Sequence, residues 1–168
     1  ELVEGGELRR NEPALSQRVT SALWMADVCQ VRNPWHLRAL LLDCQRRSVE
    51  IHPDTPVREL IFAGDRASGV RTPDAVWSAG TVVVASGAWS PQLLPPAARP
   101  IEIEPVRGQM LLLRQRAPSF RRIIECGSRY LVPRGDGRVL VGSTEERAGF
   151  VKETTPDALG DLRRFACE

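Results

Sequence analysis

Histidine, tyrosine and cysteine are scarce in this sequence, and their scarcity excludes several kinds of catalytic site. The 168 residues include two histidines, one tyrosine and four cysteines. His36 and His52 have no catalytic partner nearby in the sequence, so we expect neither a histidine-based triad nor a zinc site. The cysteines form no Cys-x-x-Cys pair or other metal-ligand spacing, which is typical of a reduced, cytosolic protein with free, buried thiols.

Long apolar runs and an excess of one charge are also absent. No run approaches the ~20 apolar residues that a membrane-spanning helix needs, and the first residues do not resemble a signal peptide. The net charge is +2 and the arginines are scattered, so there is no electrostatic reason to expect nucleic-acid binding. We therefore expect a cytoplasmic protein with neither nucleic-acid nor membrane partners.

Two helices are the clearest secondary structure in the sequence. The first begins at Asn33, which can cap it, and has Pro34 at its first position. Ser48 stands where a glycine usually follows such a helix, so this helix end must be closed differently. The second helix begins at Thr155. A further helix start is predicted at Asn11-Glu12-Pro13.

A strand is predicted over residues 81–86, because Thr-Val-Val-Val-Ala-Ser contains an unbroken β-branched run of the kind found in buried parallel strands. Gly87 follows it and lets the backbone approach another segment or a ligand closely. Ligands collect beyond the carboxyl ends of strands in open α/β sheets. A core strand followed by a tight turn explains the same pattern. Shorter strands are predicted at residues 22–25, 49–52, 57–62, 69–72, 75–78, 106–114, 122–126, 130–134 and 138–142.

The order of these segments predicts two lobes. Pro91, Pro95, Pro96 and Pro100 cluster among small residues, which is typical of a linker. Before them lie a helix, a small meander and the 81–86 strand, and after them lies a second meander with a hairpin turn at Gly135-Asp136-Gly137. The predicted fold class is therefore α/β to α+β.

A series of motifs runs along nearly the whole chain, and its joint order and spacing are specific, although each motif alone is weak. The motifs are Thr55-Pro-Val57, the segment from Thr81 to Ser90, Arg99-Pro100, Pro105-Val-Arg-Gly-Gln-Met110, Tyr130-Leu-Val-Pro-Arg134, Gly137-Arg-Val-Leu-Val-Gly142 and Ser143-Thr-Glu-Glu146. In this series the chain resembles the D-amino-acid oxidase family of FAD-dependent flavoproteins. It is most similar to the glycine oxidase branch, which serves thiamine biosynthesis.

The resemblance implies that residues 33–97 form part of an FAD-binding, Rossmann-like domain. Residues 1–32 and 98–168 would belong to a substrate domain built on a mixed, largely antiparallel sheet. Two parts of the family pattern are absent from these 168 residues, namely the strand-GxGxxG-helix that holds the FAD pyrophosphate and the region with the arginine that clamps the carboxylate. We therefore expect these residues by themselves to bind FAD weakly or not at all and to be inactive.

The resemblance also assigns candidate site residues. Val57, Ser86 and Gly87 match positions that contact FAD, although the family more often has alanine or threonine at the position of Ser86. Tyr130 matches the tyrosine that hydrogen-bonds the substrate carboxylate, and Glu145 falls near the substrate pocket. From their chemistry alone, Val57 could equally pack in a meander and Glu145 could be a solvated charge. No residue of the chain is identified as catalytic, and no metal ligand is expected.

The implied reaction is the oxidative deamination of glycine or another small amino acid or amine. Molecular oxygen would reoxidise the flavin and hydrogen peroxide would be released. An oxidase or dehydrogenase for a secondary amine such as sarcosine is the nearest alternative. A non-catalytic module that keeps the fold without flavin is an alternative of another class. A homo-oligomer is compatible with each of them.

Overall fold

The computed structural model describes residues 1–95, 102–114 and 120–168. Pro96 and Pro100 of the predicted linker lie outside the described residues. Two compact units make up the chain: unit 1 contains residues 1–30 and 105–168, and unit 2 contains residues 31–104. Unit 2 is thus inserted, in sequence, between the two parts of unit 1. That unit 1 is a substrate domain and unit 2 an FAD domain stays a prediction.

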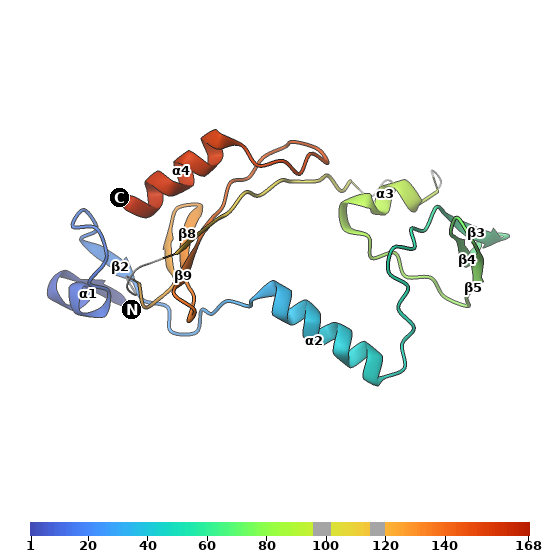
Figure 1. Ribbon diagram of the computed structural model, residues 1–168, viewed down its shortest axis with the longest axis horizontal. Helices are drawn as coiled ribbons and strands as arrows, with labels where there is room; N and C mark the ends of the chain where they lie inside the picture. The colour runs from blue at the N-terminus through green and yellow to red at the C-terminus, as the bar shows by residue number, and fades with distance from the viewer. Residues whose placement is uncertain (96–101, 115–119) are drawn as a thin grey trace. The chain divides into compact units, whose positions relative to one another are not determined.

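Unit 1 is centred on a four-stranded antiparallel sheet (Figure 1). The meander predicted from the sequence is present, with Arg134 and Arg138 closing its hairpin through a 2.7 Å hydrogen bond between the Arg134 N–H and the Arg138 carbonyl. Gly137 takes a left-handed φ of 77° in this turn, which favours glycine. The strands, in spatial order, are β6 (Leu111–Arg114), β9 (Arg138–Gly142), β8 (Arg129–Pro133) and β7 (Ile124–Cys126).

The core of unit 1 lies between this sheet and α4 (Pro156–Cys167), which begins directly after Thr155 as predicted. Leu162 of α4 is fully buried, and Phe165, one turn further along, packs against the same cluster. The helix buries these side chains because they recur at helical spacing on one face. The sheet residues buried in this cluster are Leu131, Val139 and Val141.

The first residues of the chain form a small element of unit 1 that differs from the prediction. A two-stranded sheet joins β1 (Leu2–Glu4) to β2 (Ser21–Leu23), with α1 (Gly5–Asn11) between them. Asn11-Glu12-Pro13 therefore ends a helix and does not begin one. Glu12 caps the helix through a 2.9 Å hydrogen bond from its N–H to the carbonyl of Leu8, and proline, which cannot continue a helix, is common just beyond such an end.

Unit 2 begins with α2 (Asn33–Arg46), in which Pro34 is the second residue and not the first as predicted. Asn33 does not cap this helix, because it is already the first helical residue. Arg32 occupies the cap position. At the other end, Ser48 takes the left-handed conformation of the missing glycine, with φ 57°. Its N–H donates to the carbonyl of Gln45 at 3.1 Å.

The rest of unit 2 is a three-stranded antiparallel meander followed by short helical turns. The meander confirms the three strands predicted there, with shifts of one to three residues at the ends. Gly69 lies in its middle strand so close to the third strand that a Cβ would come within 2.2 Å of the Trp77 carbonyl oxygen. The elements are β3 (Glu59–Ala63), β4 (Arg66–Arg71), β5 (Val76–Ser78), the 3₁₀ turn η1 (Gly87–Trp89) and α3 (Ser90–Leu93).

Several predicted features are wrong. Residues 81–86 and 49–52 form no strand. A parallel strand needs backbone partners on neighbouring strands, and no described residue pairs with residues 81–86. The cysteines are free thiols as expected, but three of them, Cys29, Cys126 and Cys167, are exposed and not buried. None of the described helices is both long and apolar enough to cross a membrane.

Candidate functional site

A cavity of about 600 Å³ lies in unit 2, between the start of the meander and the segment that precedes η1. Val57 and Ser86, two of the predicted cofactor-binding residues, both line it. They are 29 positions apart in the sequence, and the return of the chain after β5 brings them to one place. The lining is mainly apolar, and its residues are Pro56, Val57, Arg58, Leu60, Val70, Val82, Val83, Val84, Ala85, Ser86, Trp89, Gln92 and Leu93.

Ser86 and Gly87 form a tight turn at one end of this cavity. Gly87 has a φ of 55°, in the left-handed region, and a Cβ at this position would meet no other atom within 4 Å. The turn is held by the Trp89 N–H, which donates to the Ser86 carbonyl at 3.1 Å, and by a 3.1 Å hydrogen bond between the hydroxyls of Ser86 and Ser90. The open space beside Gly87 leaves its backbone accessible to a ligand.

The cavity fits the adenosine end of a dinucleotide better than its phosphates. Val57 precedes the first hydrogen bond of the meander, from the Arg58 N–H to the Arg71 carbonyl at 2.7 Å. Among the described residues, no hydrogen bond involves the Val57 backbone, so its N–H and C=O can face a base edge. Valine side chains and Trp89 offer apolar surface for a planar ring. Among the described residues of the lining, Arg58 is the only charged one, so phosphates would need further partners.

Tyr130, the predicted carboxylate-binding residue, lies in unit 1 on β8, directly opposite Gly142 of β9. Its ring covers the glycine, since a Cβ on Gly142 would lie 2.4 Å from both the Cζ and the hydroxyl oxygen of Tyr130. The hydroxyl donates to the sulfur of Met110 at 3.4 Å. A thioether is a weak acceptor. The exposed hydroxyl can therefore exchange this partner for a stronger one, such as a carboxylate.

Glu145 and its neighbour Glu146 have different environments. Glu145, the second predicted substrate-binding residue, is exposed, which agrees with a solvated charge. Glu146 is half-buried, and its carboxylate forms an ion pair with Nη2 of Arg107 at 2.5 Å. The Arg107 side chain is only 15% exposed. The backbones of Arg107 and Glu146 also form a two-way bridge, with both N–H···O distances 2.9 Å.

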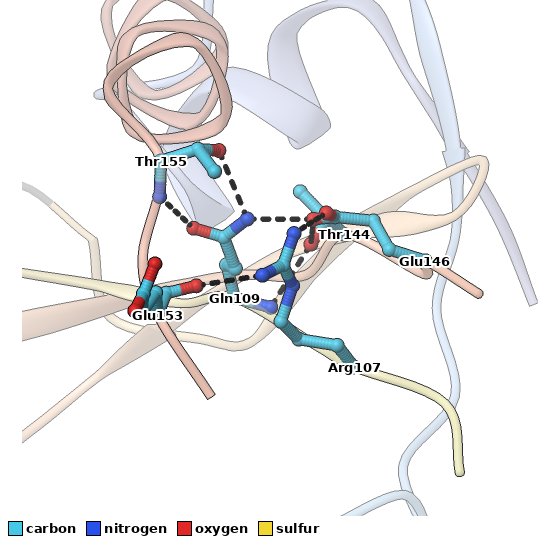
Figure 2. Close-up of polar contacts among 6 residues, drawn as sticks. All are labelled: Arg107, Gln109, Thr144, Glu146, Glu153 and Thr155. Carbon is cyan, nitrogen blue, oxygen red and sulfur yellow. Dashed lines mark hydrogen bonds and ion pairs between the residues drawn. The ribbon is translucent and has the colours of Figure 1, made fainter. Parts of the chain in front are cut away.

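Gln109 extends this ion pair into a network that joins three segments of unit 1 (Figure 2). Its Nε2 donates to Glu146 at 2.7 Å and to the Thr155 hydroxyl at 3.1 Å, while its Oε1 accepts from the Thr155 N–H at 2.7 Å. The Thr144 hydroxyl accepts from the Gln109 N–H at 2.9 Å and donates to Glu146 at 2.6 Å. Arg107 Nη1 donates to the Glu153 carbonyl at 2.9 Å.

Hydrogen bonds within this network lower the pKa of the Glu146 carboxyl from 4.5 to about 2. The Thr144 hydroxyl has the largest effect, followed by Arg107 and Gln109, while desolvation opposes them. All three donors favour the ionised form, because each one is oriented toward a carboxylate oxygen. Glu146 is therefore a fixed negative charge at neutral pH.

Glu146 should give unit 1 a specific sensitivity to acid. Its folded-state pKa lies below its unfolded value, so the ionised carboxylate stabilises the fold above pH 4.5, and this contribution is lost as the pH falls towards 2. We expect Glu146→Gln to be less stable than the wild type at pH 7, with a difference that shrinks from pH 4.5 downward. Denaturant unfolding at pH 7, 4.5 and 3 measures this difference.

The control for this measurement is Glu59→Gln, which breaks another 2.5 Å ion pair, with Arg71 in unit 2. Both side chains of that pair are more than half exposed. We expect the control to change stability little at every pH, because solvent screens exposed pairs. A Glu146→Gln deficit that stays constant down to pH 3 would contradict the assignment.

The structure thus brings two of the predicted residues, Val57 and Ser86, to one cavity, with Gly87 directly beside it. Tyr130 and Glu145 belong to the other unit. The sequence analysis missed the Arg107–Glu146 network, and Arg107, Gln109 and Glu146 appear there only as parts of motifs. No local pattern signals this network, because Arg107 and Gln109 lie more than 30 residues before their partners in it.

Comparison with known proteins identifies the family of this chain. The profile of the FAD dependent oxidoreductase family matches residues 1–168. The chain is 38% identical to a glycine oxidase of Pseudomonas aeruginosa over 157 residues, which cover 93% of this chain and 43% of the relative. It is 36% identical to the hydrogen cyanide synthase subunit HcnC of the same species, over 92% of this chain and 38% of that one.

A crystal structure of glycine oxidase from Bacillus cereus superimposes with a TM-score of 0.90 at 24% identity. It covers 99% of this chain and 46% of that chain. The superposition shows that the mixed α/β fold with antiparallel sheets is shared, and the predicted fold class is confirmed. The chain spans less than half the length of each of these relatives. Because the family profile covers the whole chain, the chain belongs to the family of FAD dependent oxidoreductases.

Proposed function

We propose that the complete protein containing this chain is an FAD-dependent oxidase that deaminates glycine or another small amino acid. The Tyr130 hydroxyl carries this proposal, because its hydrogen bond is exposed and goes to a weak acceptor, the Met110 sulfur. A substrate carboxylate would be a far better acceptor. The 38% identity to a glycine oxidase supports the same substrate class.

In this proposal the two units have separate tasks. Val57, Ser86 and Gly87 of unit 2 would hold the adenosine end of FAD through backbone contacts and apolar surface. Tyr130 would orient the substrate through its carboxylate, which is a proximity effect and not acid–base catalysis. The chemistry that FAD supplies when bound is acceptance of a hydride from the substrate carbon, with oxygen as the final oxidant and hydrogen peroxide as a product. The resulting imine is hydrolysed to a keto acid.

Other substrates fit the same fold. An enzyme for a secondary amine such as sarcosine would use the same carboxylate contact. The chain is also similar to a protein named for hydrogen cyanide synthesis, so its relatives are named for more than one reaction. Peroxide release by the complete protein, measured with glycine, sarcosine and a series of small D- and L-amino acids, separates these candidates. A yellow protein that is inactive on every amine would contradict the proposal, and a colourless protein would favour a non-catalytic module.

The cellular setting belongs to the proposal as well. We place the protein in the cytoplasm, and its resemblance to the glycine oxidase branch supports a role in thiamine biosynthesis. The free cysteines are compatible with a reducing compartment. Growth of a deletion strain with and without thiamine tests the pathway.

Tyr130→Phe should raise the Michaelis constant for the amino acid roughly 10- to 100-fold. The variant loses one hydrogen bond to a charged group, which contributes about 1.5–3 kcal/mol. The flavin absorbance spectrum should stay unchanged, since Tyr130 lies outside the unit that contains the cavity. Steady-state kinetics of the complete protein measure the effect.

The matched control is Ser128→Ala, which removes an exposed hydroxyl from the turn just before the same strand. We expect its Michaelis constant to equal that of the wild type. If Tyr130→Phe behaves like this control, Tyr130 has only a structural role and the proposed substrate contact is wrong.

A further inference from the structure

The pairing between β6 and β9 shifts by one residue just beyond the two strands. Leu111 of β6 pairs with Val141 of β9. Outside the two strands, Arg107 pairs with Glu146 in an isolated bridge. Three residues separate Arg107 from Leu111, whereas four separate Val141 from Glu146. The segment after β9 therefore contains an extra residue, as in a β-bulge, a device that re-aims side chains.

The Arg107–Glu146 network holds this bulge in place. Because side chains alternate along a strand, the extra residue decides which of the two adjacent glutamates faces Arg107. Gln109, which is 3% exposed, binds two residues of the segment after β9, Thr144 and Glu146. Its amide also binds Thr155 at the start of α4, so the bulge is anchored to the helix that covers the sheet.

Both contacts of Tyr130 lie at the edge of this network. Met110, which accepts the hydrogen bond of Tyr130, directly follows Gln109. Gly142, which lies under the tyrosine ring, is the last residue of β9 and directly precedes the bulged segment. A glycine and a flexible methionine hold a ring weakly by themselves. The position of the Tyr130 hydroxyl therefore depends on the backbone that carries these two residues.

We propose that the Arg107–Gln109–Glu146 network, with Thr144, positions the Tyr130 hydroxyl for carboxylate binding by fixing the bulge after β9. Arg107 and Glu146 are positioning residues in this proposal, because they act through Met110 and Gly142 and do not touch the substrate. The proposal rests on the proposed function, since it assumes that Tyr130 binds the substrate carboxylate. The network also leaves Nε of Arg107 buried without a hydrogen-bond partner among the described residues, a cost to stability.

A double-mutant cycle on the complete flavoprotein tests this coupling. The four proteins are the wild type, Glu146→Gln, Tyr130→Phe and the double variant. The readout is the dissociation constant of acetate, a carboxylate without an amine, measured from the perturbation of the flavin absorbance. Acetate binding requires no turnover, so it is independent of catalytic rate. Steady-state kinetics with the preferred amino acid provide a second readout, which separates the Michaelis constant from kcat.

We expect Tyr130→Phe to weaken acetate binding by at least about tenfold and Glu146→Gln to weaken it by roughly 3- to 30-fold. Adding Glu146→Gln to Tyr130→Phe should cause little further loss, because the hydroxyl to be positioned is already absent. In the kinetics, Glu146→Gln should raise the Michaelis constant more than it lowers kcat. Glu146→Asp, which keeps the charge, should recover part of the affinity.

Independent, additive losses would overturn the proposal, as would a Glu146→Gln variant that is less stable but binds acetate normally. Failure of the proposed function looks different, because Tyr130→Phe would then leave acetate binding unchanged by itself. If Glu146→Gln does not fold, Thr144→Val takes its place in the same cycle. It removes one hydroxyl of the network at nearly constant volume and keeps the ion pair.

Discussion

Gly87→Val should yield a folded but colourless protein, because valine at this position prevents flavin incorporation. The φ of Gly87 is 55°, a region in which a β-branched residue is a genuine outlier. Strain of this kind costs on the order of 1–3 kcal/mol. A valine would also fill the open space beside the turn through which the backbone can approach the cofactor. The ratio of flavin to protein absorbance in the purified complete protein measures the loss.

Unit 2 offers a matched control in Gly64→Val. Gly64 has a φ of 63°, and a Cβ there would likewise meet no atom within 4 Å. It lies in the turn between β3 and β4 and does not line the cavity. This variant therefore carries the same strain in the same unit, and we expect it to bind flavin normally. If Gly87→Val and Gly64→Val bind the same amount of flavin, whether normal or reduced, the place of Gly87 beside the cavity does not determine flavin binding.

The parts of the fold that the sequence predicts best are those set by neighbouring residues. The turn at Gly135-Asp136-Gly137 and the alternation around it specify the β8–β9 hairpin locally. The helical spacing of apolar residues specifies α4, and Leu162 on that face is fully buried. Each of these predictions depends only on residues within a single hairpin or helix.

The incorrect predictions depend on strand pairings and hydrogen bonds that the local residue pattern does not specify. The β-branched run at residues 81–86 would form a parallel strand only beside a partner strand, and no strand in the described part of the chain pairs with it. Asn11-Glu12-Pro13 contains residues that suit either end of a helix, and only the hydrogen bond to Leu8 decides between them. The different environments of Glu145 and Glu146 follow from a one-residue register shift that no local pattern reveals.

The candidate site was predicted by resemblance more than by physical chemistry. Val57 is an ordinary valine, and only its place beside Ser86 in one cavity distinguishes it from a packing residue. Tyr130 is half-buried on a strand, as many tyrosines are. Its weak hydrogen bond to Met110 is the feature that supports a ligand, and it needs coordinates to be seen.

Glu12→Ala should destabilise unit 1 by roughly 2–6 kcal/mol, the largest effect on stability that we expect from a single side chain. Glu12 is 2% exposed, and its carboxylate accepts the backbone N–H of Arg121, at 3.0 and 3.1 Å, and that of Arg122, at 3.1 Å. It thereby joins the end of α1 to the segment just before β7, about 110 residues away. Alanine would leave two N–H groups without an acceptor, each costing about 1–3 kcal/mol.

Glu7→Ala provides the comparison, because Glu7 lies on the same helix but is exposed and makes none of these contacts. Its stability should differ from that of the wild type by less than about 0.5 kcal/mol. Glu12→Gln should fall between the two glutamate-to-alanine variants, since its amide oxygen can accept from one backbone N–H while its NH₂ group faces the other donor. Denaturant unfolding of all four proteins gives the order. If Glu12→Ala is no less stable than Glu7→Ala, the long-range link through Glu12 does not stabilise the fold, and packing must hold the N-terminal segment in place.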